Sequence, residues 1–261
     1  MTSKEKMDLV LQGPYTDFTD EIIDSYLQLN FVDNIIVSCW ENDKKDEYQS
    51  NRVSYVRNSE YPSYSGVMNI NLQLITSLAG VKASSSNLVG KMRSDQKFNH
   101  QGMLNMFDYF IGNKKKEKIF ICGYYFSFLF HPRDHVFWGY REDMINLFDI
   151  PFEVNDLCQK LGVNRNNAAS YMHLLTRPET YIGAYYCSRF DDRVKKMVEN
   201  QEQYLYDNAP NWQEAKIISK EAMKKAFKSF PRKGVDFIWP KNNIYCLPYD
   251  PLYEGWDEEG Y

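Results

Sequence analysis

The sequence predicts an α/β fold: a Rossmann-like, mostly parallel sheet with helices on both faces, followed by a mainly helical C-terminal part. Through about the first 130 residues, short apolar runs alternate with segments whose apolar residues have helical spacing. Such alternation is typical of parallel strands joined by helical crossovers. Beyond that point helical spacing predominates. We therefore expect a sheet-rich half at residues 1–130 and a largely helical remainder of the same domain at residues 131–261.

Each expected element has a local signal. Strands are expected where apolar or alternating residues cluster between turn-forming residues, at positions 7–11, 34–38, 52–56, 88–93 and 118–125. Helices are expected where apolar residues recur at helical spacing, at about 19–27, 67–79, 102–110, 141–150, 154–161, 168–175, 179–206 and 212–230. Gly80 follows the second of these helices, at a position that glycine favours.

The composition excludes several classes of protein. An apolar fraction of 43% in 261 residues can form a sizeable core, which excludes general disorder. The formal charge of -4 gives no overall attraction to nucleic acid. The five cysteines form no CxxC pair and the four histidines no metal-binding spacing, which favours reduced thiols in a cytoplasmic protein. The N-terminus lacks a signal-like segment, and the longest near-apolar run, 119–130, is too short to span a bilayer.

The most informative stretch is the end of the strand expected at 88–93. Lys91, Arg93 and Asp95 stand there at alternate positions. Ligands of open α/β sheets bind beyond the carboxyl ends of the strands. Arg and Lys pair with phosphate oxygens, whereas Asp binds hard cations. The pattern therefore favours a phosphate-bearing ligand, with a divalent metal (Mn or Mg) at Asp95. An ordinary strand that ends in a charged turn would show the same residues.

Four segments occur in a recognisable order: Val-Leu-Gln-Gly-Pro at 10–14, Ile-Val-Ser-x-Trp-Glu at 36–41, Asn-x-Asn-x-Gln at 69–73 and Lys-x-Arg-Ser-Asp at 91–95. Weaker matches follow at 134–143 and at Pro-Glu-Thr-Tyr, 178–181. In these segments the sequence resembles the WavE lipopolysaccharide synthesis family, whose members are regarded as glycosyltransferases of bacterial surface polysaccharides.

This resemblance implies a GT-A-like fold, a nucleotide-sugar donor, and transfer of the sugar to a growing lipopolysaccharide or capsule glycan or to a lipid-linked acceptor. Residues 1–130 would then bind the donor, and residues 131–261 would form the acceptor side. The sequence departs from the family at Leu72, where a basic residue is expected beside Gln73. It departs from the Asp-x-Asp metal signature of GT-A enzymes at Arg93, which takes the place of the first aspartate.

Residues at the ends of the first two expected strands are candidates for the donor site. Gln12 and Gly13 could hold the nucleotide through backbone groups, because glycine lets a ligand approach closely. A plain turn would use the same two residues. Ser38 and Trp40 end the second strand on the same edge and could line the nucleotide pocket. Alternatively, the tryptophan packs over the sheet.

Four further side chains complete the expected donor site. Asn69 and Gln73 share one face of their helix and could reach the donor, although solvated amides would show the same spacing. Lys91 and Arg93 would offset the charge of the donor diphosphate.

Catalysis is assigned to Asp134, His135 and Asp95. Asp134 follows a buried strand and could act as general base on the acceptor hydroxyl. His135 competes for that role because its ordinary pKa is closer to neutrality. Asp134 could instead cap its turn by bonding to nearby backbone amides. Asp95 would hold a metal ion or a ribose hydroxyl.

The sequence is also compatible with two other functions and with a peripheral membrane contact. A nucleotidyl- or phosphotransferase could use the same sheet, although it would need more carboxylates around its metals. A degenerate, non-catalytic partner in a polysaccharide assembly complex is the second alternative. The helix expected at 212–230 has lysines opposite an apolar side. It could lie on the inner membrane as a peripheral contact, or its apolar side could pack into the domain.

Overall fold

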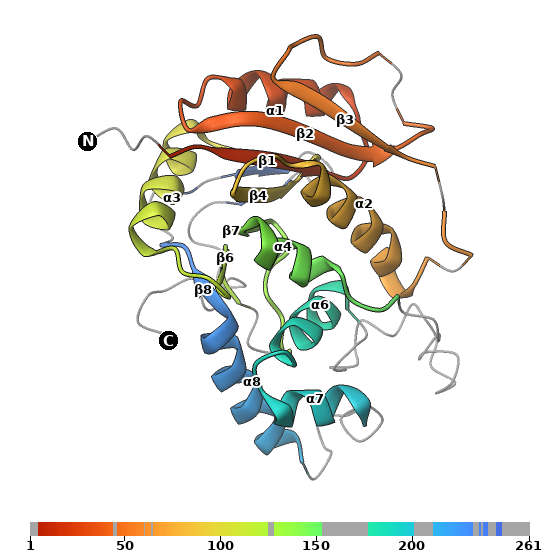
Figure 1. Ribbon diagram of the computed structural model, residues 1–261, viewed down its shortest axis with the longest axis vertical. Helices are drawn as coiled ribbons and strands as arrows, with labels where there is room; N and C mark the ends of the chain where they lie inside the picture. The colour runs from red at the N-terminus through yellow and green to blue at the C-terminus, as the bar shows by residue number, and fades with distance from the viewer. Residues whose placement is uncertain are drawn as a thin grey trace.

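The structure, a computed structural model, is shown in Figure 1. It describes residues 5–43, 46–59, 61–63, 65–124, 128–152, 177–200, 211–231, 235, 237–239 and 244–246. The helices expected at 154–161 and 168–175 and the acidic C-terminal tail lie outside the described residues.

A seven-stranded sheet forms the centre of the molecule, with strand order β3-β2-β1-β4-β7-β6-β8. Its strands are β1 (Met7–Gln12), β2 (Val32–Trp40), β3 (Val53–Asn58), β4 (Leu88–Arg93), β6 (Ile119–Ile121), β7 (Val136–Tyr140) and β8 (Phe227–Ser229). The first four strands are parallel, β7 runs antiparallel to both β4 and β6, and β8 is parallel to β6. The predicted mostly parallel sheet is therefore confirmed. A smaller sheet contains β5 (Lys97–Phe98), β9 (Phe237–Trp239) and β10 (Ile244–Cys246).

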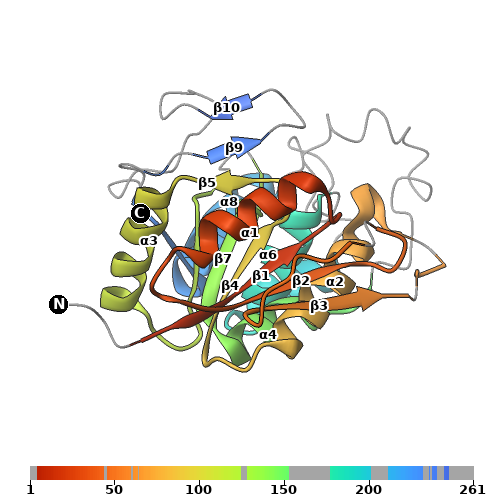
Figure 2. The same cartoon turned by 90° about the horizontal axis from the view of Figure 1, so that it is seen from above.

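Both faces of the large sheet are covered because its strands bury alternate residues on opposite sides. In β1, Leu9 and Leu11 belong to one apolar core and Val10 to the other. The first core includes residues of α1 (Asp17–Leu27) and α3 (His100–Asn113). The second includes residues of α2 (Ile70–Ala83), α4 (Arg141–Phe148), α6 (Pro178–Cys187), α7 (Asp192–Glu199) and α8 (Trp212–Ala226). Figure 2 shows α1 and α4 on opposite sides of the sheet.

Several helix boundaries differ from the sequence prediction. The helix expected at 212–230 ends at Ala226, and Phe227–Ser229 form strand β8 instead. Gly80 does not end α2, which continues to Ala83. Instead Gly80 lets the helix approach the sheet, because an added Cβ would lie 2.4 Å from Val10 Cγ1. In the described part of the helix expected at 179–206 there are two helices, α6 and α7, with a break at 188–191, and residues 201–206 lie outside the described residues. Asp191 caps α7 by accepting a hydrogen bond from the backbone N–H of Arg193.

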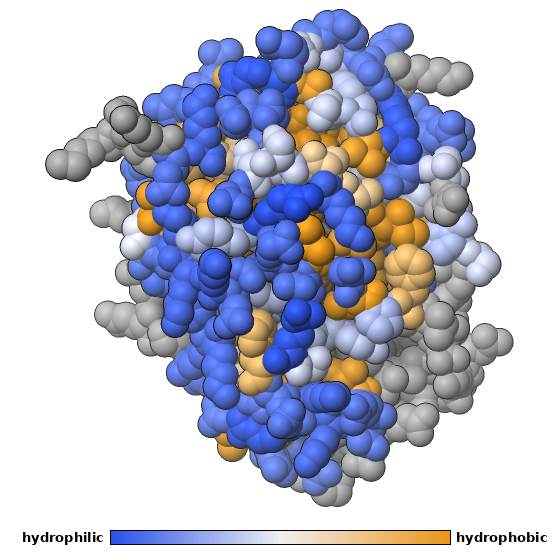
Figure 3. All heavy atoms as spheres, in the orientation of Figure 1, coloured by the Kyte–Doolittle hydropathy of each residue, from blue (hydrophilic) through white to orange (hydrophobic). Residues whose placement is uncertain are grey.

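Helix α8 packs its apolar side into the core, as the second interpretation of its sequence predicted. The apolar residues on that side are buried: Trp212, Ala215, Ile218, Ala222, Met223 and Ala226. The surface over α7 and α8 is largely hydrophilic (Figure 3). None of the described helices combines the length and the apolar character needed to cross a bilayer.

The chain order creates a switch point beside β1. The chain places β2 and β3 on one side of β1 and then crosses back through the short helix η1 (Val67–Asn69) and α2 to β4 on the other side. Strands β1 and β4 are parallel neighbours, so their carboxyl ends lie together. Because β7 runs antiparallel to β4, β7 begins at the edge where β4 ends. Open α/β sheets bind ligands at such an edge.

Candidate active site

Three chain segments meet at this edge. In the register of the sheet, Gln12 of β1 lies opposite Arg93 of β4. On the other side of β4, Met92 lies opposite Val136, so Asp134 and its loop are next to the end of β4. The structure thus brings together the ends of strands that are far apart in the sequence.

Arg93 is fixed by two carboxylates. Its Nε and Nη2 donate to the two oxygens of Asp95, at 2.9 and 3.0 Å, and its Nη1 donates to Asp134 Oδ2 at 2.9 Å. Burial alone would lower the pKa of Arg93, but Asp134 and Asp95 raise it above its ordinary value. A quarter of the Arg93 side chain remains exposed. The guanidinium is therefore charged, held in one orientation and still accessible from the sheet edge.

Lys91 lies beneath Arg93 and is fully buried. Its ammonium donates to the backbone oxygen of Asp134 at 3.2 Å and lies 5.5 Å from the centre of the Phe137 ring. Burial lowers the pKa of Lys91 to about 8. Lys91 thus holds the loop of Asp134 in place. It also adds positive charge to the interior side of the site, without reaching the surface.

Asp134 and His135 stand side by side but have different environments. Burial would raise the pKa of the Asp134 carboxyl, yet Arg93 and Lys91 hold it well below its usual range. His135 Nδ1 lies 2.9 Å from Gln96 Oε1, and burial lowers the pKa of His135 to about 4. At neutral pH the site therefore presents an ionised aspartate and an uncharged imidazole.

Glu179, in the first turn of α6, is a site residue that is not among the candidates predicted from the sequence. Its Oε2 lies 3.6 Å from His131 Nε2, and 20% of its side chain is exposed. Burial and the negative charge of Asp134 raise the pKa of Glu179 to about 7. Burial and Arg177 lower the pKa of His131 to about 3, so this imidazole carries no charge at neutral pH. The weak match to the family at 178–181 was the only feature of the sequence that pointed to Glu179.

The loop that carries Asp134 is held tightly by two helices. Phe130 has a left-handed backbone with φ of 50°, and its N–H donates to Ser219 Oγ of α8 at 2.7 Å. Helix α6 touches the same residue, because a Cβ added to Gly183 would lie 2.0 Å from the Phe130 carbonyl oxygen. Asp134 and Glu179 are thereby fixed relative to each other by packing outside the site itself.

The candidates at the ends of β1 and β2 make contacts within the fold. Gln12 Nε2 donates to Thr76 Oγ1 of α2 at 3.0 Å, and the buried Ser38 hydroxyl donates to the Thr76 carbonyl at 2.6 Å. Gly13 has φ of 131°, and an added Cβ would lie 2.6 Å from Ser94 Oγ. These residues connect β1 and β2 to α2 and β4.

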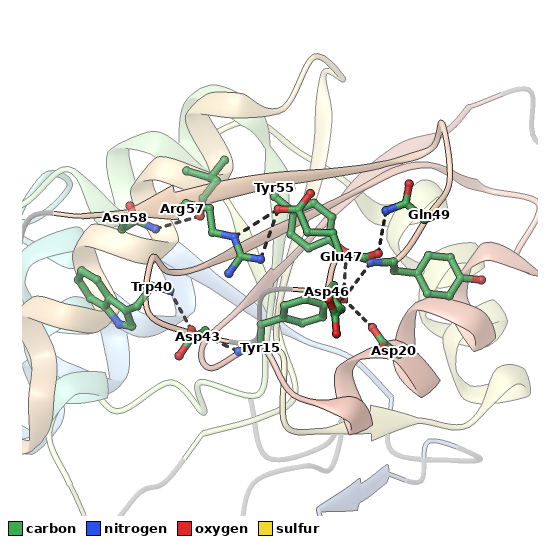
Figure 4. Close-up of polar contacts among 12 residues, drawn as sticks. Tyr15, Asp20, Trp40, Asp43, Asp46, Glu47, Gln49, Tyr55, Arg57 and Asn58 are labelled. Atoms are coloured by element: carbon green, nitrogen blue, oxygen red, sulfur yellow. Dashed lines mark hydrogen bonds and ion pairs between the residues drawn. The ribbon is translucent and has the colours of Figure 1, made fainter.

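Trp40 ends β2 among aromatic and charged residues (Figure 4). Its ring stacks on Tyr61 with the ring centres 4.1 Å apart. Tyr61 is 54% exposed, so it offers an open aromatic face while Trp40 is almost covered. Asp43 Oδ2 accepts hydrogen bonds from the backbone N–H groups of Trp40 and Tyr15, which fixes the loop after β2 onto the loop after β1. Arg57 extends this network by packing against Tyr15.

Asn69 and Gln73 lie at the start of α2. Asn69 is the exposed N-cap, with a left-handed backbone (φ 65°). Gln73 is half-buried, and its Nε2 has no hydrogen-bond partner among the residues that the structure describes. Gln73 is therefore the stronger candidate of the two for a ligand contact.

The metal expected at Asp95 receives no support from the geometry. Both Asp95 oxygens face the Arg93 guanidinium, so a divalent cation there would meet a like charge. Across the described ranges, no three His, Cys, Asp or Glu side chains are grouped so as to hold a metal ion. In this arrangement the described residues do not form a metal site by themselves, and the two Asp95 oxygens orient Arg93.

Comparisons with known proteins identify one family. The model of the WavE lipopolysaccharide synthesis family matches residues 9–220. No curated protein sequence matches the chain.

Similar solved structures include 4-diphosphocytidyl-2C-methyl-D-erythritol synthase from Anaerococcus prevotii, with 12% identity, 61% of this chain and 85% of that chain covered, and a TM-score of 0.40. HddC from Yersinia pseudotuberculosis has 12% identity, covers 58% and 85%, and has a TM-score of 0.37. A cytidylyltransferase from Leptospira borgpetersenii has 13% identity, covers 77% and 99%, and has a TM-score of 0.35. Similarity at this level does not argue for a particular reaction.

Proposed function

The chain belongs to the WavE lipopolysaccharide synthesis family, and on that premise we propose that it transfers a sugar from a nucleotide-sugar donor to a growing lipopolysaccharide or capsule glycan. One observation carries the proposal. Arg93 stands at the switch-point edge of the sheet, accessible and held in one orientation by Asp95 and Asp134. Such a guanidinium suits the diphosphate of a nucleotide sugar.

The residues at this edge can assist departure of the nucleoside diphosphate. When the bond from the sugar to the diphosphate breaks, negative charge grows on the leaving phosphate oxygen. Arg93 would stabilise that charge, and the buried Lys91 adds to the positive potential from below. A preoriented cation at the position where charge develops lowers the barrier without having to reorganise. The accessible ring of Tyr61, supported by Trp40, would stack on the base of the donor.

Nucleotidyl transfer and a purely binding role are the competing functions. Product analysis distinguishes both of them from glycosyl transfer. Glycosyl transfer releases a nucleoside diphosphate from a nucleotide sugar. Nucleotidyl transfer releases pyrophosphate from a nucleoside triphosphate and joins the nucleotide to a sugar phosphate. A binding protein releases neither.

We expect one nucleoside diphosphate to raise the melting temperature of the protein. A ligand at 100 times its Kd adds about 2.7 kcal/mol of stability, or about 5 to 10 °C for a chain of this size. The measurement is a thermal-shift panel of nucleoside mono-, di- and triphosphates and nucleotide sugars, with Mn²⁺ or with EDTA, followed by product analysis for each stabilising ligand. Pyrophosphate release from a triphosphate, with no turnover of any nucleotide sugar, would contradict sugar transfer.

We also propose that lysines at the opposite edge of the sheet contact an anionic membrane surface. Lys118 Nζ donates to the Lys224 carbonyl, which joins the turn before β6 to the end of α8. Lys115, Lys116 and Lys225 are exposed beside them. Since α8 buries its apolar side, this contact would be electrostatic. It lies where β6 and β8 begin, away from Arg93, so it would hold the enzyme at the membrane rather than bind substrate.

We expect salt-sensitive binding to vesicles that contain anionic lipid. Removing two lysines in the double variant Lys115→Gln/Lys116→Gln should weaken it about 30-fold, because each lysine near such a surface contributes about 1 kcal/mol. The matched control is Lys195→Gln/Lys196→Gln, which removes the same charge from exposed positions of α7. Sedimentation with vesicles at two salt concentrations measures the effect. Equal losses in the two double variants would show that net charge alone is responsible.

A further inference from the structure

Resting on the proposed sugar transfer, we infer that Glu179, rather than Asp134, is the general base that takes the proton from the acceptor hydroxyl. The two carboxylates belong to the same edge but have different partners. Asp134 Oδ2 accepts a hydrogen bond from Arg93 Nη1, and the backbone oxygen of Asp134 accepts one from the buried ammonium of Lys91. Glu179 has the imidazole of His131 as its neighbour.

Asp134 is poorly suited to accept a proton. Its protonation would remove the charge that fixes Arg93, and two cations hold its pKa well below the usual range. A carboxylate that is so weakly basic provides little driving force for proton transfer near neutral pH. Asp134 is therefore a positioning residue, which holds the guanidinium that meets the donor.

Glu179 has the geometry and the environment of a base. Pro178 begins α6 and Gly183 packs on Phe130, so the first turn of the helix is fixed against the loop of Asp134. Part of the Glu179 side chain is exposed, so a hydroxyl group can reach it. Its carboxyl group faces charged and titratable groups from β4, the loop before β7 and the start of α6. The groups concerned are Lys91, Arg93, Asp134, His131 and Arg177.

The proton transfer completes a balanced reaction. The Glu179 carboxylate takes the proton of the acceptor O–H group, and the acceptor oxygen forms a bond to the anomeric carbon. The bond from that carbon to the phosphate oxygen breaks, and its electron pair leaves with the nucleoside diphosphate at Arg93. Since this is a single displacement, the sugar arrives with inverted anomeric configuration.

The pH dependence follows from the raised pKa of about 7 for Glu179. The base works in its ionised form, which is scarce below this pKa and predominates above it. Turnover should therefore rise with pH through about 7 and fall again above about 8, where Lys91 loses its positive charge. An ordinary glutamate, with a pKa near 4.3, would give a flat profile over the same interval.

We expect Glu179→Gln to lower kcat about 100-fold, to leave the KM for the donor unchanged, and to abolish the rise of kcat with pH. Glu179→Asp should retain that rise at a reduced rate. The matched control is Glu142→Gln, the same change at the second position of α4, where the side chain is 79% exposed. The measurement is the kinetics of transfer between pH 5.5 and 9, with melting temperatures and the anomeric configuration of the product.

The possible outcomes separate this inference from the proposed function. If the wild-type chain transfers no sugar from any nucleotide sugar, the proposed function itself fails. If the wild type transfers sugar and Glu179→Gln retains both its kcat and its pH profile, the assignment of the base is wrong. A lower melting temperature and a higher KM with an intact pH profile would likewise overturn it, because they would show a structural role. A product with retained configuration would exclude the single displacement.

Discussion

Replacing Arg93 by methionine is expected to lower kcat/KM for the donor about a thousandfold. Methionine keeps much of the side-chain volume but removes the charge that meets the diphosphate, and a single preoriented stabiliser of developing charge typically contributes two to three orders of magnitude. The fold should lose about 3 kcal/mol as well, because the buried Asp134 loses its ion-pair partner. Donor kinetics, nucleotide affinity and melting temperature measure these effects.

Two other variants separate the contribution of the positive charge of Arg93 from that of its geometry and orientation. Arg93→Lys keeps a positive charge without the planar fork, so we expect an intermediate loss of donor affinity and a smaller loss of stability. Asp95→Asn keeps only one carbonyl oxygen for the guanidinium, so it should weaken donor binding about tenfold, in the presence and absence of Mn²⁺ alike. Near wild-type transfer by Arg93→Met would remove Arg93 from the donor site. A selective rescue of Asp95→Asn by added metal would restore the metal assignment.

Gly183→Ala is expected to destabilise the chain by about 3 kcal/mol and to reduce transfer about 100-fold. The added methyl group would overlap the Phe130 carbonyl oxygen at 2.0 Å, which is closer than any real contact. Phe130 cannot easily move away, since its left-handed backbone is tied to Ser219 of α8. Helix α6 must therefore shift, and with it Glu179. A displacement of about 1 Å at a reacting group costs about 100-fold in rate.

Gly112→Ala is the matched control for this prediction. Gly112 also lies in a helix, α3, and an added Cβ would meet nothing within 4 Å. Alanine there should stabilise the chain by about 0.5 to 1 kcal/mol, because it restricts the unfolded chain at no steric cost. Denaturant unfolding and transfer assays on both variants provide the measurement. Equal stability of the two alanine variants would show that the contact between Gly183 and Phe130 can rearrange at little cost in stability.

Local patterns predicted five of the seven strands of the large sheet and part of its functional edge, but neither β7 nor β8, and the residues of β8 were expected to continue a helix. Apolar runs predicted the ends of strands β1, β2 and β4 to within two residues, because buried strands are marked by their own apolar side chains. In the run at 118–125, of which residue 125 is not described, Ile119–Ile121 form β6 and Tyr124 makes an isolated bridge to Pro132. Placing Lys91, Arg93 and Asp95 at the end of β4 required only the knowledge that parallel strands end at one edge.

The roles of individual side chains depended on contacts that no local pattern encodes. Ser38 was a candidate for the donor site, but its hydroxyl bonds to α2, whose packing depth is set by Gly80. Asp134 was expected to accept the acceptor proton, and only the ion pair with Arg93, 41 residues away, shows why its carboxyl stays ionised. Glu179 carried almost no signal, since a glutamate in a first helical turn is ordinary.

The sequence alone determined the α/β class, the order of the main elements from β1 to β6, the family and the cluster of charges at the end of β4. All of these depend on residues that are close together in the chain or on motifs read along it. Only the tertiary structure decided the antiparallel course of β7, the orientation of Arg93 and the difference between Asp134 and Glu179. The physical reason is that burial and neighbouring charge set a pKa, and both are properties of the space around a group.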